Sequence, residues 1–354
     1  MRIRLLFLAC VLFLWSDDVL AQEDVPFHTW EVYIERDIDI AGTDRLHFVD
    51  LLLGDVSTLD VNGERYTPIN DTILFFDRTN RAVMTAYPDE RLVPHPFVSL
   101  GAARRVDWVV SADERQIVWT LTYDDASGLT TISTVASSIG TNQNLILSDG
   151  PRTDGARALP VAFTQDNSAI MFDSQPDGIG DLAPYQQYAN LFQLSLVTGE
   201  ITPMPGEPSC FCAAALWAGQ LLRLDVTASF NGFDIQRFDL RVDTINTIPA
   251  AGNYTQGGNI LISPDGTRAA YALSQLNTDN SAVSSVLMYV DLVTMTQTQL
   301  STPLTAYLMP IQWTEDNTSI LFTIPDRDGT WKVNRNSQAP VQVSTLSYVG
   351  VIEN

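Results

Sequence analysis

The chain has 354 residues, of which 42 are acidic and 20 are lysine or arginine, and its formal net charge is −22. A surface this acidic repels phosphate backbones, which argues against nucleic acid as a partner. It favours solubility and the attraction of basic partners or divalent cations. Hydrophobic residues make up 45% of the chain, so a domain of this length can bury a core that needs no disulfide or metal to be stable.

Residues 1–21 have the pattern of a secretory signal peptide. Two arginines stand among the first four residues, an apolar run covers residues 5–15, and a polar stretch closes on Ala21. We therefore predict cleavage after Ala21. An uncleaved anchor and a lipid on Cys10 are the alternatives, although the apolar run is shorter than the roughly 20 residues of a membrane-spanning helix. We expect a secreted or periplasmic protein that is not transmembrane once the signal is removed.

A short pattern recurs about every 50 residues along the chain. It consists of an apolar or aromatic residue, Ser or Thr, one further residue, Asp and a turn residue, followed by an alternating apolar run. The clear copies contain Asp113, Asp166, Asp265 and Asp316, and a worn copy without Asp covers residues 217–220. A hydroxyl and a carboxylate at this spacing bind backbone N–H groups in tight turns between antiparallel strands. These four aspartates are therefore predicted to be structural turn residues.

A second pattern lies between these copies: an apolar strand that ends in Asp-Leu, a turn, and a short Thr-rich strand, as at Asp50, Asp239 and Asp291. Two hairpins per unit make four strands, and radial repetition of four-stranded units is typical of a β-propeller. Beyond the signal, no segment has sustained helical periodicity. We predict that residues 22–354 form one all-β domain, a β-propeller with four-stranded blades.

The number of blades depends on residues 66–100, where strands are expected at residues 73–76 and 82–84. Counting this segment as a unit gives seven blades, and omitting it gives six as the alternative. The first unit is short at its front. A strand near residues 348–352 is therefore expected to complete it and to close the ring.

Three stretches carry a family resemblance: residues 263–266 (Ser-Pro-Asp-Gly), residues 313–317 (Trp-Thr-Glu-Asp-Asn) and residues 196–200 (Leu-Val-Thr-Gly-Glu). They resemble the WD40-like repeats of exported TolB-like propellers, and they are similar to the N-terminal propellers of prolyl oligopeptidase and dipeptidyl peptidase relatives. The resemblance covers about residues 46–344 and implies the fold.

The same resemblance implies little about function, because its motif residues build turns. Residues 22–46 are too few for the small α/β domain that precedes the TolB propeller, so the envelope role of TolB is not expected here. No hydrolase domain is expected after the propeller, so peptidase activity does not carry over either. The Trp-Asp dipeptide of true WD repeats is also missing from the sequence.

The sequence contains no strong catalytic pattern. It has no Gly-x-Ser-x-Gly pentapeptide, and its last histidine is His95, which argues against the commonest serine hydrolase triads. Asp173, Asp177 and Asp181 crowd a glycine-containing loop, where hard oxygen ligands suit calcium. This loop is the one candidate cofactor site, and Asp-Gly is also an ordinary turn signal.

Cys210 and Cys212 are the two cysteines that follow the signal. Export permits a disulfide between them, although a bridge over a single intervening residue is strained. Two free thiols in a loop are the alternative.

Two functional hypotheses follow from the sequence. The first is a non-enzymatic propeller that binds a protein, a peptide or a glycan. The second is a metal-dependent hydrolase or lyase, with calcium as its metal and its site in the central channel. A weaker third hypothesis is a remnant of a propeller-peptidase without its catalytic partner.

Overall fold

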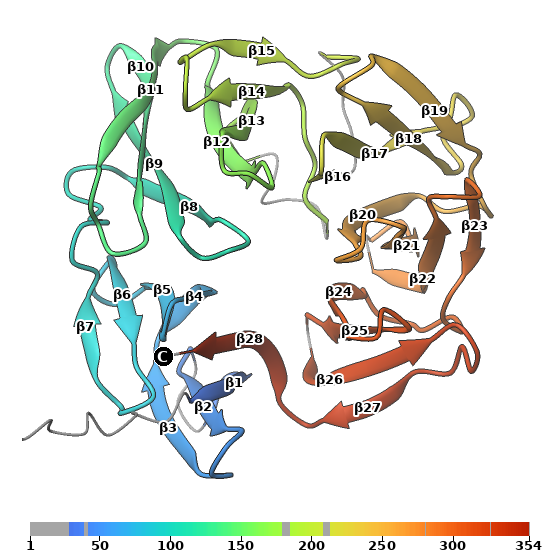
Figure 1. Cartoon of the computed structure of the whole chain (residues 1–354), viewed down its shortest axis with the longest axis horizontal. Coiled ribbons are helices and arrows are strands. Elements are labelled where there is room, and N and C mark those ends of the chain that lie inside the picture. The colour runs from blue at the N-terminus through green and yellow to red at the C-terminus, as the bar shows by residue number, and fades with distance from the viewer. Residues whose placement is uncertain are drawn as a thin grey trace, which may run out of the picture.

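The computed structural model describes residues 28–38, 42–178, 185–207, 213–279, 281–325 and 327–353. In this part of the chain every regular element is a β-strand. The strands form seven four-stranded antiparallel sheets that stand as blades around a central axis (Figure 1). The predicted all-β propeller is confirmed, with seven blades and not six. The predicted signal peptide lies outside the described residues.

The blades are numbered in chain order, and the strands of each are given from the axis outward. Blade 1 consists of β28 (Ser347–Glu353), β1 (Thr29–Glu35), β2 (Asp44–Asp50) and β3 (Val56–Val61). Blade 2 consists of β4 (Gly63–Ile69), β5 (Thr72–Asp77), β6 (Ala82–Ala86) and β7 (Leu92–Pro94). Blade 3 consists of β8 (Arg105–Val110), β9 (Gln116–Asp125), β10 (Gly128–Ser137) and β11 (Asn144–Arg152). Blade 4 consists of β12 (Ala156–Phe163), β13 (Ala169–Pro176), β14 (Leu191–Ser195) and β15 (Ile201–Pro203).

The remaining blades follow the same order. Blade 5 consists of β16 (Ala213–Trp217), β17 (Gln220–Val226), β18 (Phe233–Asp239) and β19 (Thr244–Ile248). Blade 6 consists of β20 (Gln256–Ile262), β21 (Arg268–Leu276), β22 (Ala282–Asp291) and β23 (Thr296–Gln299). Blade 7 consists of β24 (Met309–Trp313), β25 (Ser319–Ile324), β26 (Arg327–Asn334) and β27 (Val341–Ser344).

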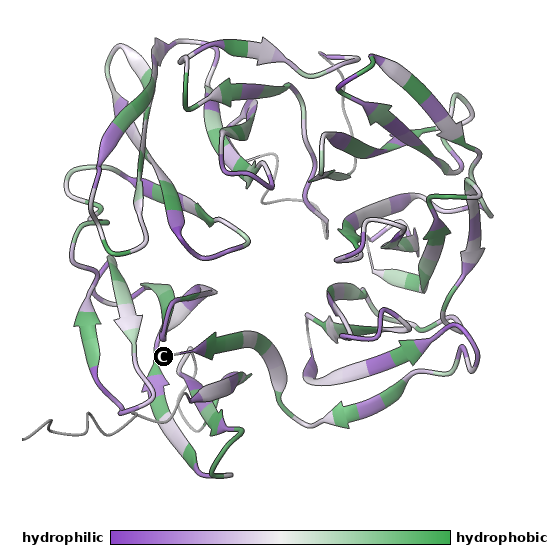
Figure 2. Cartoon of the chain, viewed as in Figure 1, coloured by the Kyte–Doolittle hydropathy of each residue, from purple (hydrophilic) through white to green (hydrophobic). Residues whose placement is uncertain are grey.

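The hydropathy pattern explains how the blades stack. Strand β2 alternates between buried and half-buried residues along its length, as expected when side chains point to opposite faces of a sheet. Strand β5 is buried almost throughout, because blades cover both of its faces. The outer strand β15 (Ile-Thr-Pro) is exposed throughout, because no further strand or blade covers it. Figure 2 shows this mixture of apolar and polar positions in every blade.

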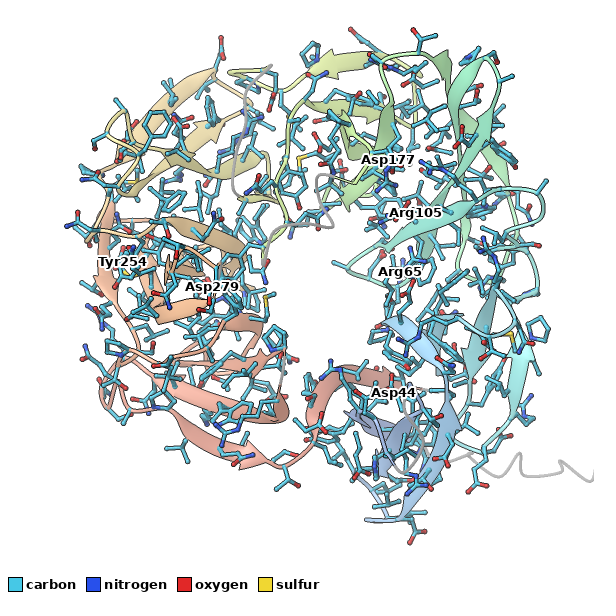
Figure 3. All side chains as sticks on the ribbon, turned by 180° about the vertical axis from the view of Figure 1, so that it is seen from behind. Asp44, Arg65, Arg105, Asp177, Tyr254 and Asp279 are labelled. Atoms are coloured by element: carbon cyan, nitrogen blue, oxygen red, sulfur yellow. The ribbon has the colours of Figure 1, made fainter. Side chains whose placement is uncertain are left out.

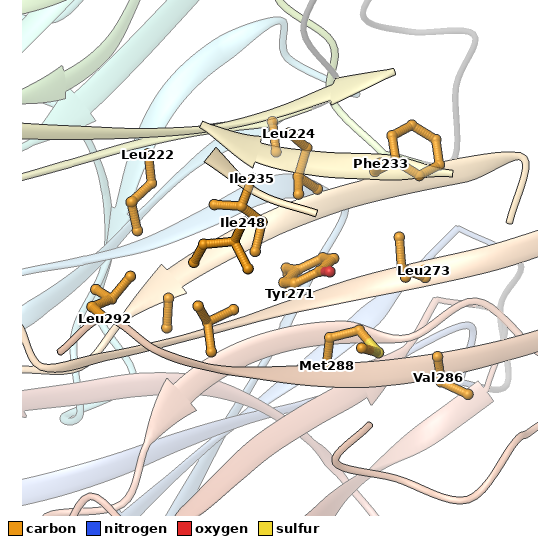
Figure 4. Packing of buried hydrophobic residues seen from close by; sticks show 13 residues of the cluster. Leu222, Leu224, Phe233, Ile235, Ile248, Tyr271, Leu273, Val286, Met288 and Leu292 are labelled. Carbon is orange, nitrogen blue, oxygen red and sulfur yellow. The ribbon is translucent and has the colours of Figure 1, made fainter. Parts of the chain in front are cut away.

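The hydrophobic core lies between neighbouring blades. Six clusters of buried side chains are found among the described residues, and each joins two adjacent blades. In the cluster of Figure 4, Leu224 and Phe233 of blade 5 pack against Tyr271 and Met288 of blade 6. Full burial of such a side chain stabilises the fold by about 1.5–3 kcal/mol. Each blade is therefore held mainly by its neighbours.

Both ends of the described chain meet in blade 1. Strand β28 pairs antiparallel with β1, with Trp30 opposite Ile352 and Val32 opposite Gly350. This confirms the predicted closing strand near the C-terminus. The strands expected at residues 73–76 and 82–84 are β5 and β6 of blade 2.

The four aspartates of the first pattern lie in the turns that join the inner strand of a blade to the next strand. In each turn the Ser or Thr two positions earlier donates its hydroxyl to the aspartate, at 2.6 Å from Ser111 to Asp113, for example. These hydrogen bonds are the main reason why the pKa of Asp113 lies below its usual range. The residue after each aspartate has a left-handed backbone, as Asn167 does at φ 55°. This geometry explains why Asn or Gly stands there in three of the four copies.

No described segment forms a helix that could span a bilayer.

Candidate functional site

A cavity of about 290 Å³ lies against the inner strands β4, β8 and β12, where blades 2, 3 and 4 face the axis. We call it the arginine cavity, after the side chains that define it: Arg65, Arg105, Asp107, Trp108, Arg157 and Gln175. Figure 3 labels Arg65, Arg105 and Asp177, which follow one another along one side of the ring's centre. Consecutive inner strands each contribute one arginine to the same space.

The charge of this cavity is opposite to that of the whole chain. Three arginines and a single aspartate line it, whereas acidic residues outnumber lysine and arginine 42 to 20 in the sequence. A concave site with one sign of charge concentrates ligands of the opposite sign. The arginine cavity is thus suited to an anion.

Asp107 is the carboxylate at the centre of the cluster. Its oxygens lie 3.3 Å from Nη1 of Arg65, 3.0 Å from Nε of Arg105 and 2.8 Å from Nη1 of Arg157. Arg157 is almost fully buried and makes a second ion pair, at 2.7 Å, with Asp177. The arginines are therefore held in place by internal carboxylates, and a buried cation without such partners would be strongly destabilising.

Arg65 has an unusual backbone and an unusual environment. Its φ is +58°, in the left-handed region, and it lies at the bulge between Glu64 and Thr67 where β4 shifts register against β5. Its guanidinium carbon stands 4.5 Å from the centre of the Trp108 ring, and burial lowers its pKa. Bulges and left-handed non-glycine residues are enriched at functional sites, where they direct one side chain.

Two residues that line the cavity, Gln175 and Arg65, have buried polar atoms without a hydrogen-bond partner among the described residues. Gln175 is 1% exposed, and among the described residues neither its amide nitrogen nor its amide oxygen has a hydrogen-bond partner. Nε of Arg65 is likewise buried and makes no hydrogen bond to any described residue. Buried polar groups are nearly always paired in folded proteins, so each exception needs an explanation.

Larger cavities, of about 410 to 500 Å³, occur elsewhere in the described part of the chain. No buried and unpartnered polar atom of a described residue lines any of them. The arginine cavity therefore remains the best candidate for a built site.

The two described aspartates of the predicted calcium loop, Asp173 and Asp177, have different partners. Asp173 is fully buried on β13, and its Oδ1 accepts the backbone N–H groups of Ala189 and Asn190 at 3.0 and 2.8 Å. Burial raises its pKa to about 6. Asp177 is paired with Arg157 and with Arg104.

Asp181, the third residue of that loop, lies outside the described residues, as do Cys210 and Cys212. The calcium site and the disulfide therefore stay predictions. Among the residues that the structure does describe, no group of three or more His, Cys, Asp or Glu side chains is arranged to hold a metal.

The three arginines of the cavity were not predicted from the sequence. They lie about 40 to 50 residues apart, one on each of three inner strands, so no local motif contains two of them. The sequence did contain one signal that could have revealed them: in a chain with few cations, one arginine recurs near the start of three successive blades.

No protein-family model and no curated protein matches the sequence of this chain. Solved structures do match. A prolyl endopeptidase has a TM-score of 0.59 at 9% identity, over 91% of this chain and 50% of that chain. An oligogalacturonate lyase from Vibrio parahaemolyticus has a TM-score of 0.52 at 11% identity, over 89% of this chain and 85% of that chain. TolB from Acinetobacter baumannii has a TM-score of 0.47 at 12% identity, over 78% of this chain and 63% of that chain.

The chain spans less than two thirds of the TolB chain and half of the prolyl endopeptidase chain. At 9 to 12% identity these similarities concern the fold alone. Together with the seven closed four-stranded blades, the matches to the prolyl endopeptidase and the oligogalacturonate lyase identify the chain as a seven-bladed β-propeller.

Proposed function

We propose that this chain is an exported, non-enzymatic binding propeller that holds a protein, a peptide or a glycan through an anionic group in the arginine cavity. The observation that carries the proposal is the gathering of Arg65, Arg105 and Arg157 on three inner strands of an otherwise acidic chain. Export is proposed from the signal-like residues 1–21.

The charge distribution supports a single docking position for such a ligand. An anion is repelled by most of a surface with a net charge of −22 and is attracted where arginines outnumber aspartates. Charge complementarity of this kind contributes mainly to specificity and to the rate of association. The strands that carry the arginines are held between packed blades, so the site is formed before the ligand arrives.

The test compares wild-type protein with two variants on arrays of defined peptides, folded proteins and oligosaccharides. Arg65→Gln removes a cavity cation. Arg152→Gln is the matched control, because Arg152, the last residue of the outer strand β11, is similarly exposed but pairs with Asp149 and Asp154.

We expect binding that Arg65→Gln weakens and that Arg152→Gln leaves unchanged, with no change in the mass of the bound probes. Binding that ignores Arg65→Gln would place the ligand elsewhere on the propeller. Conversion of a probe by the wild-type protein would contradict the non-enzymatic assignment.

A further inference from the structure

The arginine cavity contains more hydrogen-bonding capacity than the chain itself uses. Gln175 presents one donor group and one acceptor, and Arg65 presents Nε, all of them buried and without a hydrogen bond to any described residue. Leaving such groups unpaired destabilises a fold. A ligand that paired them would recover this energy on binding. The following inference rests on the proposed binding function and concerns what the ligand presents.

Asp107 indicates which chemical group the arginines accept. Its carboxylate is approached by Arg65, Arg105 and Arg157 at once, at 2.8 to 3.3 Å. Arginine forks match the planar geometry of a carboxylate. The lining itself carries three arginines and one carboxylate. The two other carboxylates that pair with Arg157 and Arg65, Asp177 and Glu64, do not line the cavity.

The lining of the cavity favours a peptide over a sugar. A sugar ring usually packs on an exposed aromatic face, but the guanidinium of Arg65 covers the Trp108 ring at 4.5 Å, and Tyr188 is only 9% exposed. The Gln175 amide, by contrast, offers the donor and acceptor that one peptide group needs. A volume of about 290 Å³ is at the small end for ligand sites and suits the end of a chain.

From these contacts we infer that the arginine cavity captures the C-terminal carboxylate of a peptide or protein, with Arg65 binding the carboxylate and Gln175 binding the last peptide group. Capture of a terminal carboxylate by preformed donors is an established mode of peptide recognition. Arg105 and Arg157 add positive charge, and Asp107 keeps the arginines in position when the site is empty.

The experiment uses the full chain and two pools of random octapeptides that differ only at the C-terminus, one with a free carboxylate and one with an amide. Affinity is measured by fluorescence anisotropy at low and at physiological salt, because screening weakens charge pairing. We expect the carboxylate pool to bind about tenfold or more tightly than the amide pool, and less tightly as salt rises.

Three outcomes would overturn the inference, and only one of them touches the proposed function. If the two pools bind equally and Arg65→Gln abolishes this binding, the cavity binds peptides but does not recognise the C-terminal carboxylate. Binding of an oligouronate without binding of either pool would assign the cavity to an acidic glycan. If no peptide, protein or oligosaccharide binds in a way that depends on Arg65, both proposals fail.

Variants distinguish contact from general disruption. Gln175→Leu keeps the size of the side chain and removes the amide, so the preference for the carboxylate pool should persist while overall affinity falls several-fold. Arg65→Lys should restore part of the carboxylate preference that Arg65→Gln removes, since it keeps the charge and loses the fork. Circular dichroism melts confirm folding, and Arg152→Gln should behave as wild type in both pools. An unchanged affinity in Gln175→Leu would remove Gln175 from the site.

Discussion

Gln175 lies directly opposite Arg157 on the neighbouring strand and is almost fully buried, yet its amide has no described partner. A buried polar group without partners costs about 1–3 kcal/mol. A residue that serves only the fold would be apolar here. Retaining an amide at this position trades stability for the chemistry of the cavity.

Replacing this amide should therefore stabilise the protein. Gln175→Leu is expected to raise the free energy of unfolding by about 1 kcal/mol or more, because it removes the unpaired atoms at similar volume. Urea unfolding measures the change. Gln236→Leu is the matched control, since Gln236 donates to Asp225 at 2.6 Å, and it should not stabilise. A loss of stability in Gln175→Leu would mean that the amide is paired in solution.

Asp173 provides a second residue-scale prediction, through pH. Burial raises its folded pKa to about 6, from an ordinary value of 3.8. The folded state therefore holds the proton more tightly than the unfolded state. The contribution of protonated Asp173 to the free energy of unfolding is fully present below about pH 3.8 and is lost as the pH rises through 6.

Asp173→Asn should remove this penalty. Relative to wild type, the variant should gain about 2 kcal/mol of unfolding free energy between pH 4 and pH 7.5, measured by urea unfolding at both pH values. The unfolding free energy of Asp166→Asn, relative to wild type, should instead fall over the same pH range. Hydrogen bonds from Ser168 and Thr164 lower the pKa of Asp166, so its ionised form stabilises the folded state. A difference between Asp173→Asn and wild type that stays constant with pH would show that Asp173 does not titrate as described.

At the scale of the element, the hairpin turns also join neighbouring blades. In the turn between β20 and β21, Gly266 has φ +67°, and a Cβ atom on it would lie 2.2 Å from the Trp217 ring of blade 5. Asn167 of blade 4 similarly donates to both oxygens of Asp113 in blade 3, at 3.0 Å each. One turn thus fixes both its own hairpin and the adjacent sheet.

Two glycine variants separate these roles. Gly266→Ala should lose about 2–4 kcal/mol of unfolding free energy, from the left-handed backbone and from the clash with Trp217. Gly199→Ala should lose only about 1 kcal/mol, since its φ is +73° but nothing lies within 4 Å of its Cβ position. Thermal melts of the two variants measure the difference. Equal losses would mean that the contact with Trp217 does not constrain the turn.

These turns also show why the fold was readable from the sequence. The bonds from Ser111 to Asp113 and from Ser263 to Asp265 join residues two positions apart, so the pattern is local and repeats with each blade. The same locality made the blade count and the closing strand predictable. The repeated pattern gave no information about function, because its Ser, Thr and Asp residues form the hydrogen bonds of the turns.

The candidate site could not be predicted from the sequence, because its residues are far apart in the chain. Arg65, Arg105 and Arg157 meet only because the ring brings three inner strands together. The left-handed backbone of Arg65 and the unpaired amide of Gln175 depend on packing that no sequence spacing expresses. Asp173 and Asp177, by contrast, stood out in the sequence, and the structure places one inside a blade and the other against arginines.

At the scale of the whole molecule, closure of the ring depends on one strand. Removing residues 347–354 deletes β28, which covers the inner edge of β1 and supplies Ile352 to the core between blades 1 and 2. We expect the truncated protein to melt at a lower temperature in a broader transition, and to associate through the exposed edge. Calorimetry and light scattering measure both effects.

A control for this truncation is available on an outer strand. Replacing the exposed Val341 and Val343 of β27 by serine leaves the ring closed and should leave the melt unchanged. If the truncated protein melts like wild type, the pairing of β28 with β1 is not what closes the propeller.

The pairing of β28 with β1 also sets the order of events during synthesis. Strand β1 finds its inner neighbour only when β28 has been made. Blades 2 to 7 are each contiguous in sequence and can form once their own strands have been made, whereas blade 1 also requires β28. The closed ring, which fixes the spacing of the arginines across three blades, therefore forms only once β28 is present.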